Sequence, residues 1–371
     1  MVIRLLMNFL LASSLSAAFY TPGTESVPHV SIGSREFVRL MTDLSEPEGY
    51  FDSDNFISNE GAYLKILPDI REQVSGGAYI GVGPDQNYSY IAHLKPEIAF
   101  IIDIRRQNAL QHLYFKALFQ LSSTRVQYLE RLFGRRIEVP GDTRTYGISD
   151  LLRQIDASRF DNGFAEKKQA EAIKVIQSWD PGLKSSDYES IRFIAQAFMS
   201  KGPDLKFTSF NRPPRAQYPS YRELLEATDS AGVQSNYLAN ENYFLLIKKM
   251  HRENRIIPIV GDLAGSYALS HVGDELRRRK IGMTCFYASN VEFYLFGGTR
   301  WDPYVRNVDS LPRTGNALMI RSFARFWWTD PAPLPGYYMQ TTTQPVEQFL
   351  ADEKTGKNKS YRNLILRPGQ R

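Results

Sequence analysis

The stretch at residues 76–87, GGAYIGVGPDQN, most constrains how this chain can fold. Its first part, residues 78–82, is a short apolar run typical of a buried strand. Gly81 and Gly83 then permit a sharp turn and a close approach of a ligand to the backbone. The stretch therefore predicts a strand, a glycine turn and a helix over about residues 85–95.

A second apolar run, residues 98–102, comes directly after this helix and ends in Asp103. The acid follows the glycine turn by about twenty residues, which is the spacing of a Rossmann nucleotide-binding unit. A lone Gly-x-Gly is also found in tight turns that bind nothing. The flanking strands, the helix and the acid favour a ligand site at residues 76–103.

Further along, three more apolar runs resemble strands: residues 256–261, 282–289 and 316–323. A possible edge strand covers residues 337–343. Helical patterns alternate with these runs, so we expect an α/β fold, a doubly wound Rossmann-like sheet with a large helical insertion.

The same patterns divide the chain into segments. In order, we expect a signal peptide at 1–18, helices and loops at 19–75, a Rossmann-like core at 76–121 and 255–345, the helical insertion at 122–254, and a loose basic tail at 346–371.

The first eighteen residues have the features of an export signal. Arg4 gives a positive start, residues 5–12 are apolar apart from Asn8, and residues 16–18 are small. We expect cleavage after Ala18 and an exported protein, periplasmic or secreted. The alternative is an apolar N-terminal helix in a cytoplasmic protein. No later stretch is apolar over the length that a membrane span requires.

Composition argues against several functions. The 45 basic and 40 acidic residues are interspersed and give a net charge of +5, so no nucleic-acid-binding tail is visible. The five histidines and the single cysteine, Cys285, have no metal-ligand spacing, so we expect no metal site. The expected partner is a small molecule, and the oligomeric state stays open.

Taken together, these motifs resemble a class I S-adenosylmethionine-dependent methyltransferase, which implies methyl transfer to an unidentified small-molecule or protein acceptor. The residues GVGPDQNYSYI and IDIRR also resemble an uncharacterised bacterial family with a Rossmann-like core. The resemblance implies that Gly81 and Gly83 admit the methionine end of the cofactor, that Asp103 binds the ribose, and that Asp262 contacts the adenine. It also places Asn290 beside the transferred methyl group.

Two positions depart from the methyltransferase pattern. The family has an acid two residues before the first glycine, where this chain has Tyr79, and its third glycine is replaced by Asp85. A carboxylate at a helix N-terminus repels a pyrophosphate, which argues against NAD or FAD. It does not argue against S-adenosylmethionine, which is cationic, and Asp85 joins the expected cofactor-binding residues.

Candidate catalytic carboxylates come from two places. Asp54 and Glu60 lie in an aromatic and acidic segment, residues 45–60, that is either a capped loop or a polar lip over the pocket. Glu292 lies just after Asn290. Any one of the three could take the proton of a methyl acceptor.

A second function is consistent with the same cleft. An exported protein does not normally meet S-adenosylmethionine, so the alternative is a non-catalytic Rossmann-like protein that binds a small polar or cationic ligand. Asp85, Asp103 and Asp262 would repel one another in a dry, empty pocket. We therefore expect a positive partner, either a ligand or an arginine such as Arg105 or Arg106.

Overall fold

The computed structural model describes residues 31–210, 215–324, 326 and 334–365. The expected signal peptide at 1–18 therefore lies outside the described residues. Within these ranges the chain is a mixed α/β protein with a single six-stranded sheet. The strands are β1 (Ala78–Val82), β2 (Ile98–Asp103), β3 (Ile256–Val260), β4 (Met283–Ser289), β5 (Arg313–Ala324) and β6 (Met339–Pro345).

Helices occupy most of the remaining chain. They are α1 (Ser34–Asp43), α2 (Leu67–Gln73), α3 (Gln86–Leu94), α4 (Arg106–Leu121), α5 (Arg125–Phe133), α6 (Ile148–Ala157), α7 (Asn162–Ser178), α8 (Ser185–Lys201), α9 (Tyr221–Leu225), α10 (Glu241–Arg252), α11 (Ala268–Arg279), α12 (Val291–Leu295), α13 (Trp301–Ser310), α14 (Val346–Lys354) and α15 (Tyr361–Ile365).

The sheet has the strand order β3-β2-β1-β4-β5-β6. The first five strands are parallel, and β6 runs antiparallel to β5 at the edge. Every residue of β1, β2 and β3 is buried, as expected for parallel strands that are covered on both faces. The expected α/β class is confirmed, the sheet is mostly parallel, and β2 and β3 are neighbours in it.

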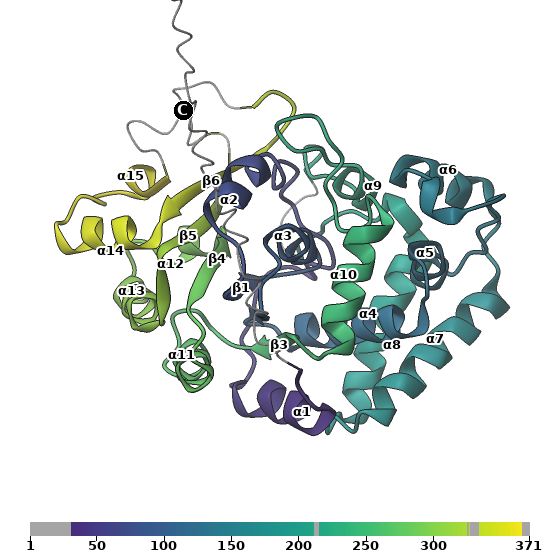
Figure 1. Ribbon diagram of the computed structural model, residues 1–371, viewed down its shortest axis with the longest axis horizontal. Coiled ribbons are helices and arrows are strands. Elements are labelled where there is room, and N and C mark those ends of the chain that lie inside the picture. The colour runs from purple at the N-terminus through teal and green to yellow at the C-terminus, as the bar shows by residue number, and fades with distance from the viewer. Residues whose placement is uncertain (1–30, 211–214, 325, 327–333, 366–371) are drawn as a thin grey trace, which may run out of the picture.

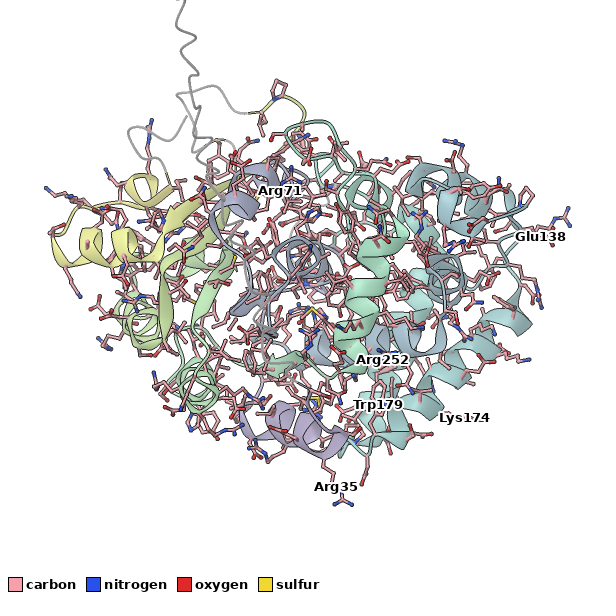
Figure 2. The ribbon with its side chains drawn as sticks, in the orientation of Figure 1. Arg35, Arg71, Glu138, Lys174, Trp179 and Arg252 are labelled. Carbon is pink, nitrogen blue, oxygen red and sulfur yellow. The ribbon has the colours of Figure 1, made fainter. Side chains whose placement is uncertain are left out.

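Helices lie on both sides of this sheet. Figure 1 shows α11, α13 and α14 on one side and α3, α4 and α10 on the other. Helices α5 to α10 fall within the segment expected to be a helical insertion, and α10 packs against both α3 and α4. Charged side chains such as Arg35, Glu138 and Lys174 point away from the body of the molecule (Figure 2).

Local sequence explains where several helices begin and end. Thr124 begins α5, because its side chain accepts a hydrogen bond from the backbone N–H of Gln127 at 3.3 Å. Gly134 ends the same helix with a left-handed φ of 62°. Asn240 caps α10 through the N–H of Tyr243 at 3.0 Å.

Two segments differ from the sequence expectation. Ser58 or Asn59 could cap a helix over about residues 60–66, but residues 61–66 form turns and the helix α2 begins only at Leu67. The C-terminal segment expected to be a loose tail contains α14 and α15. They form because Phe349, Leu350 and Leu364 are buried against the protein core. Their apolar residues outweigh the basic and polar composition on which the expectation relied.

None of the helices within the described ranges combines the length and the apolar character that a bilayer crossing requires.

Candidate functional site

A cavity of about 420 Å³ lies at the carboxyl ends of the parallel strands. The sheet topology explains this position. Strand β2 lies on one side of β1 and strand β4 lies on the other, so the order of the strands reverses between β1 and β4. A crevice opens at such a point in an α/β sheet. Each strand contributes the residues at its end. They include Gly83 after β1, Asp103 of β2, Asp262 after β3, Ser289 of β4 and Phe323 of β5.

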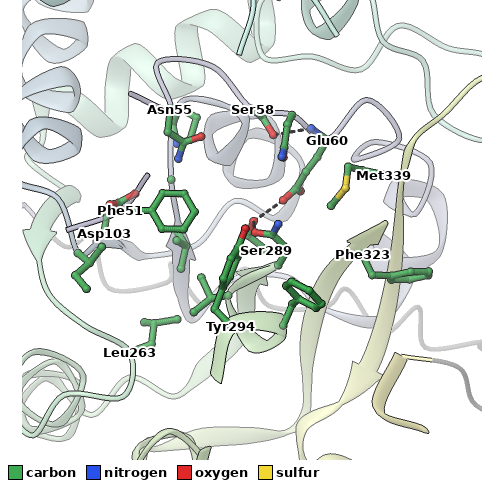
Figure 3. Close-up of a pocket in the computed structure, with 18 of the residues that line it drawn as sticks. Phe51, Asn55, Ser58, Glu60, Asp103, Leu263, Ser289, Tyr294, Phe323 and Met339 are labelled. Carbon is green, nitrogen blue, oxygen red and sulfur yellow. Dashed lines mark hydrogen bonds between the residues drawn. The ribbon is translucent and has the colours of Figure 1, made fainter. Parts of the chain in front are cut away.

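The segment at residues 45–60 closes the other side of this cavity. Tyr50, Phe51, Asn55, Ser58 and Glu60 all line it. Figure 3 shows Phe51, Asn55 and Glu60 reaching toward the strand ends. This arrangement corresponds to the polar lip, the second of the two interpretations of that segment.

The two glycines of the turn have different roles. A Cβ at Gly81 would lie 2.0 Å from Oδ1 of Asn87, so Gly81 leaves room for that amide. Asn87 holds the turn: its Nδ2 donates to the carbonyl of Val82 at 2.9 Å, and its Oδ1 accepts from the Tyr79 hydroxyl at 2.7 Å. Gly81 is not among the residues lining the cavity, whereas Gly83 lines it with φ +88°.

His112 contacts the backbone of the same turn. Its Nε2 lies 2.9 Å from the carbonyl oxygen of Gly83, and its Nδ1 lies 2.6 Å from the hydroxyl of Tyr88. Burial lowers the pKa of His112 to about 4, so the ring is neutral near pH 7. A neutral ring that donates from Nε2 and accepts at Nδ1 satisfies both contacts. His112 therefore acts as a structural support for the glycine turn.

Asp85, expected to bind a cofactor, is not among the residues that line the cavity. Its carboxylate accepts hydrogen bonds from the hydroxyls of Tyr221 at 2.5 Å and Tyr237 at 2.8 Å. Burial raises the pKa of Asp85 to about 6. The side chain thus joins the start of α3 to α9 and to the segment before α10, and the expectation that it binds a ligand is corrected.

The two remaining expected acids do line the cavity, and each has an arginine partner. Asp103 is paired with Arg105 at 3.1 Å, and both side chains are buried. Asp262 is paired with Arg300, in a more exposed setting. Arg105 was one of two expected partners, whereas Arg300 was not foreseen. Arg106, the other candidate, pairs instead with Asp187 of α8.

Glu60 lines the cavity and is almost fully buried. It is 1% exposed and accepts hydrogen bonds from three hydroxyls, those of Tyr287, Ser289 and Ser322, the last at 2.6 Å. Burial raises the pKa of Glu60 above its usual range. Ser289 holds this position in a left-handed conformation, φ 54°, which is uncommon for a residue other than glycine and is often found at functional sites.

The other candidate residues are placed differently. Asn290 lines the cavity. Glu292 does not: it is buried in an ion pair with Arg321, and the Tyr304 hydroxyl donates to it at 2.9 Å. Asp54 is also not among the lining residues, and its carboxylate accepts a hydrogen bond from the Thr208 hydroxyl. Of the three candidate catalytic carboxylates, the structure brings only Glu60 into the cavity.

Sequence reasoning missed two kinds of lining residue. Gln86 lines the cavity and is 5% exposed, yet its Oε1 has no hydrogen-bond partner in the described structure. Aromatic side chains also form much of the lining, among them Phe51, Tyr294 and Phe323. The aromatic residues in segment 45–60 were the only signal of this lining in the sequence. No group of three or more potential ligand residues is arranged to hold a metal ion in the described ranges.

Two comparisons with known proteins bear on the chain. A family model described as a domain of unknown function, DUF7790, matches residues 55–138 and 150–368. This match covers the sheet, most of the residues that line the cavity, and most of the helical insertion. No curated protein matches the sequence.

Proposed function

Because this chain belongs to the DUF7790 family, whose description assigns no activity, we propose a function from the cleft itself: an S-adenosylmethionine-dependent methyltransferase-like protein acting on a small molecule. The carrying observation is that the glycine turn after β1, the acid ending β2 and the acid after β3 all border one cavity. The strand order, with an antiparallel strand beside β5, is consistent with a Rossmann-like sheet.

The residues present fit such a cofactor in most respects. A cavity of about 420 Å³ is adequate for a small molecule. Gly83 would face its methionine end, Asp103 its ribose hydroxyls and Asp262 its adenine. Asp103 already accepts three hydrogen bonds from Arg105, whereas a carboxylate has about four acceptor positions. It can therefore accept from one further hydroxyl.

When bound, the cofactor would supply a methyl group activated by a sulfonium. The protein's contribution would be to orient the acceptor, since such transfers depend mainly on positioning. Glu60 is the side chain best placed to hold or remove the acceptor's proton, because it lines the cavity, is buried and has a raised pKa. The aromatic lining would exclude water around it.

Asp262 offers the cleanest mutational test. Its ion pair with Arg300 is partly exposed, so Asp262→Asn should change folding stability by no more than about 1 kcal/mol. Loss of a charged acceptor should weaken S-adenosylmethionine binding by roughly tenfold or more. The measurement is the shift in melting temperature with added ligand.

The matched control is Asp274→Asn, which removes the carboxylate of another surface Asp–Arg pair, at 2.7 Å from Arg277. It should leave the ligand-induced shift as in the wild type. Equal shifts in all three proteins would exclude Asp262 from the site. Asp103 is less suitable for this test, because its substitution would leave the buried Arg105 without its charge partner.

A specific observation also favours the second function, a non-catalytic binding protein with the same cleft. Arg105 and Arg300 already neutralise the two acids at the ends of β2 and β3, so neither carboxylate needs a cofactor to compensate its charge. Export would strengthen this alternative. N-terminal sequencing of the native protein distinguishes the two: a start near Phe19 favours an exported binding protein, and a retained N-terminus favours the enzyme.

A further inference from the structure

The cavity has two chemically different halves. Asp103 and Leu263 lie toward β2 and β3, whereas Ser289, Phe323 and Met339 lie toward β4, β5 and β6 (Figure 3). Glu60 belongs to the second half, because its three hydrogen-bond donors are on β4 and β5. This second half, which we call the Glu60 recess, is defined by Glu60, Gln86, Ser289, Phe323 and Met339.

Hydrogen-bond directions show which groups in the recess remain unsatisfied. Gln86 donates through Nε2 to the hydroxyl of Tyr287 at 3.2 Å, and that hydroxyl donates to Oε2 of Glu60. Ser322 donates to the same oxygen, so Oε2 has two donors. Oε1 has one donor, Ser289, and a carboxylate oxygen can accept about two. Oε1 of Gln86 has none.

The open positions in the recess are therefore acceptors on Glu60 and Gln86. A buried polar atom without a partner is unfavourable, and the Oε1 atom of Gln86 is such an atom. A ligand that donates hydrogen bonds would satisfy these acceptors.

The charges around the recess also favour a ligand that donates hydrogen bonds and carries a positive charge. Asp103, Asp262 and Glu292 each have an arginine partner. Glu60 has only hydroxyl partners among the residues that the structure describes. A buried carboxylate is unfavourable unless a cation or sufficient hydrogen bonds compensate it.

The walls of the recess are apolar. Phe323 is 1% exposed and Met339 is 3% exposed, and both line the cavity. Aromatic faces also attract cations, which adds to the preference for a positively charged group on an apolar body.

We propose that the Glu60 recess binds the protonated amine of the methyl acceptor, carried on an apolar or aromatic body, and that this amine is a separate molecule from the cofactor. The inference rests on the proposed function only in calling the ligand a methyl acceptor. The ammonium donates to Oε1 of Glu60 and to Oε1 of Gln86, while its carbon body packs on Phe323 and Met339. An acid or a neutral alcohol would leave the Glu60 charge without compensation.

The test is calorimetry on the folded full chain without any cofactor. Benzylammonium and phenethylammonium are compared with benzyl alcohol and phenethyl alcohol, which have nearly the same shape and no charge. At least one ammonium should bind about tenfold or more tighter than its alcohol, because charge-assisted hydrogen bonds are the stronger ones. Equal binding within each pair, or no binding by either ammonium, overturns the proposal.

Two variants test whether the preference for the ammonium over the alcohol arises in the Glu60 recess. Glu60→Gln should abolish the preference for the ammonium, and Asp54→Asn, which removes a nearby carboxylate outside the cavity lining, should retain it. A folded Glu60→Gln protein that keeps the preference contradicts the proposal. If that variant does not fold, the wild-type comparison still decides. Titration with S-adenosylmethionine is independent, so either proposal can fail alone.

Discussion

Single residues of the glycine turn act through packing more than through contact with a ligand. Gly81 has no space for a side chain, because Asn87 fills it and is fixed there by hydrogen bonds to Tyr79, Val82 and Pro84. The turn is thus held by the side-chain amide of Asn87, which follows the Gly-x-Gly pattern by four residues. At Gly83 the reason for glycine is different, namely the positive φ.

Gly81→Ala should therefore destabilise the protein by about 1–3 kcal/mol, as expected for overpacking in a fixed environment. The measurement is the urea unfolding midpoint. Gly315→Ala is the matched control, since a Cβ there would meet nothing within 4 Å. An unchanged midpoint for Gly81→Ala would show that Asn87 moves aside at little cost.

At the scale of elements, buried polar side chains connect the sheet to the helices around it. Asp85 at the start of α3 binds the hydroxyls of Tyr221 in α9 and Tyr237 before α10. Because burial raises the pKa of Asp85 to about 6, its folded state binds a proton more readily than its unfolded state.

The consequence is a stability that changes with pH between about 4 and 6, the interval from the unfolded to the folded pKa. There the folded state binds more protons, so Asp85 makes the protein less stable as pH rises through this interval. The total effect is up to about 3 kcal/mol, at about 1.4 kcal/mol per pKa unit. The contribution of Asp85 is measured as the free energy of unfolding of the wild type minus that of Asp85→Asn, determined at each pH. Parallel curves for the two proteins would contradict the assignment.

At the scale of the whole molecule, the sequence was most informative about the sheet. Apart from Asp103 at the end of β2, the strands β1, β2 and β3 carry no charged side chain, because both faces of the sheet are covered there, so they could be recognised as short apolar runs. Asp103 and Asp262 could be placed together because carboxyl ends of parallel strands meet at one edge.

The rest depended on contacts between distant residues. Asp85 meets tyrosines 136 and 152 residues away, and Glu60 meets Ser322, 262 residues away. The sequence contains no local signal for either contact. Glu292 of α12 was misplaced for the same reason, since its ion-pair partner Arg321 lies in strand β5, 29 residues further along the chain. The helical C-terminal segment was missed because its few apolar residues are spaced among charges.

The central claim is that the cleft at the strand ends binds S-adenosylmethionine, and titration calorimetry of the wild-type protein tests it most directly. We predict a saturable heat with one ligand per chain, reduced in Asp262→Asn. Absence of heat at millimolar ligand, in protein shown to be folded by its far-UV spectrum and cooperative melting, would contradict the claim.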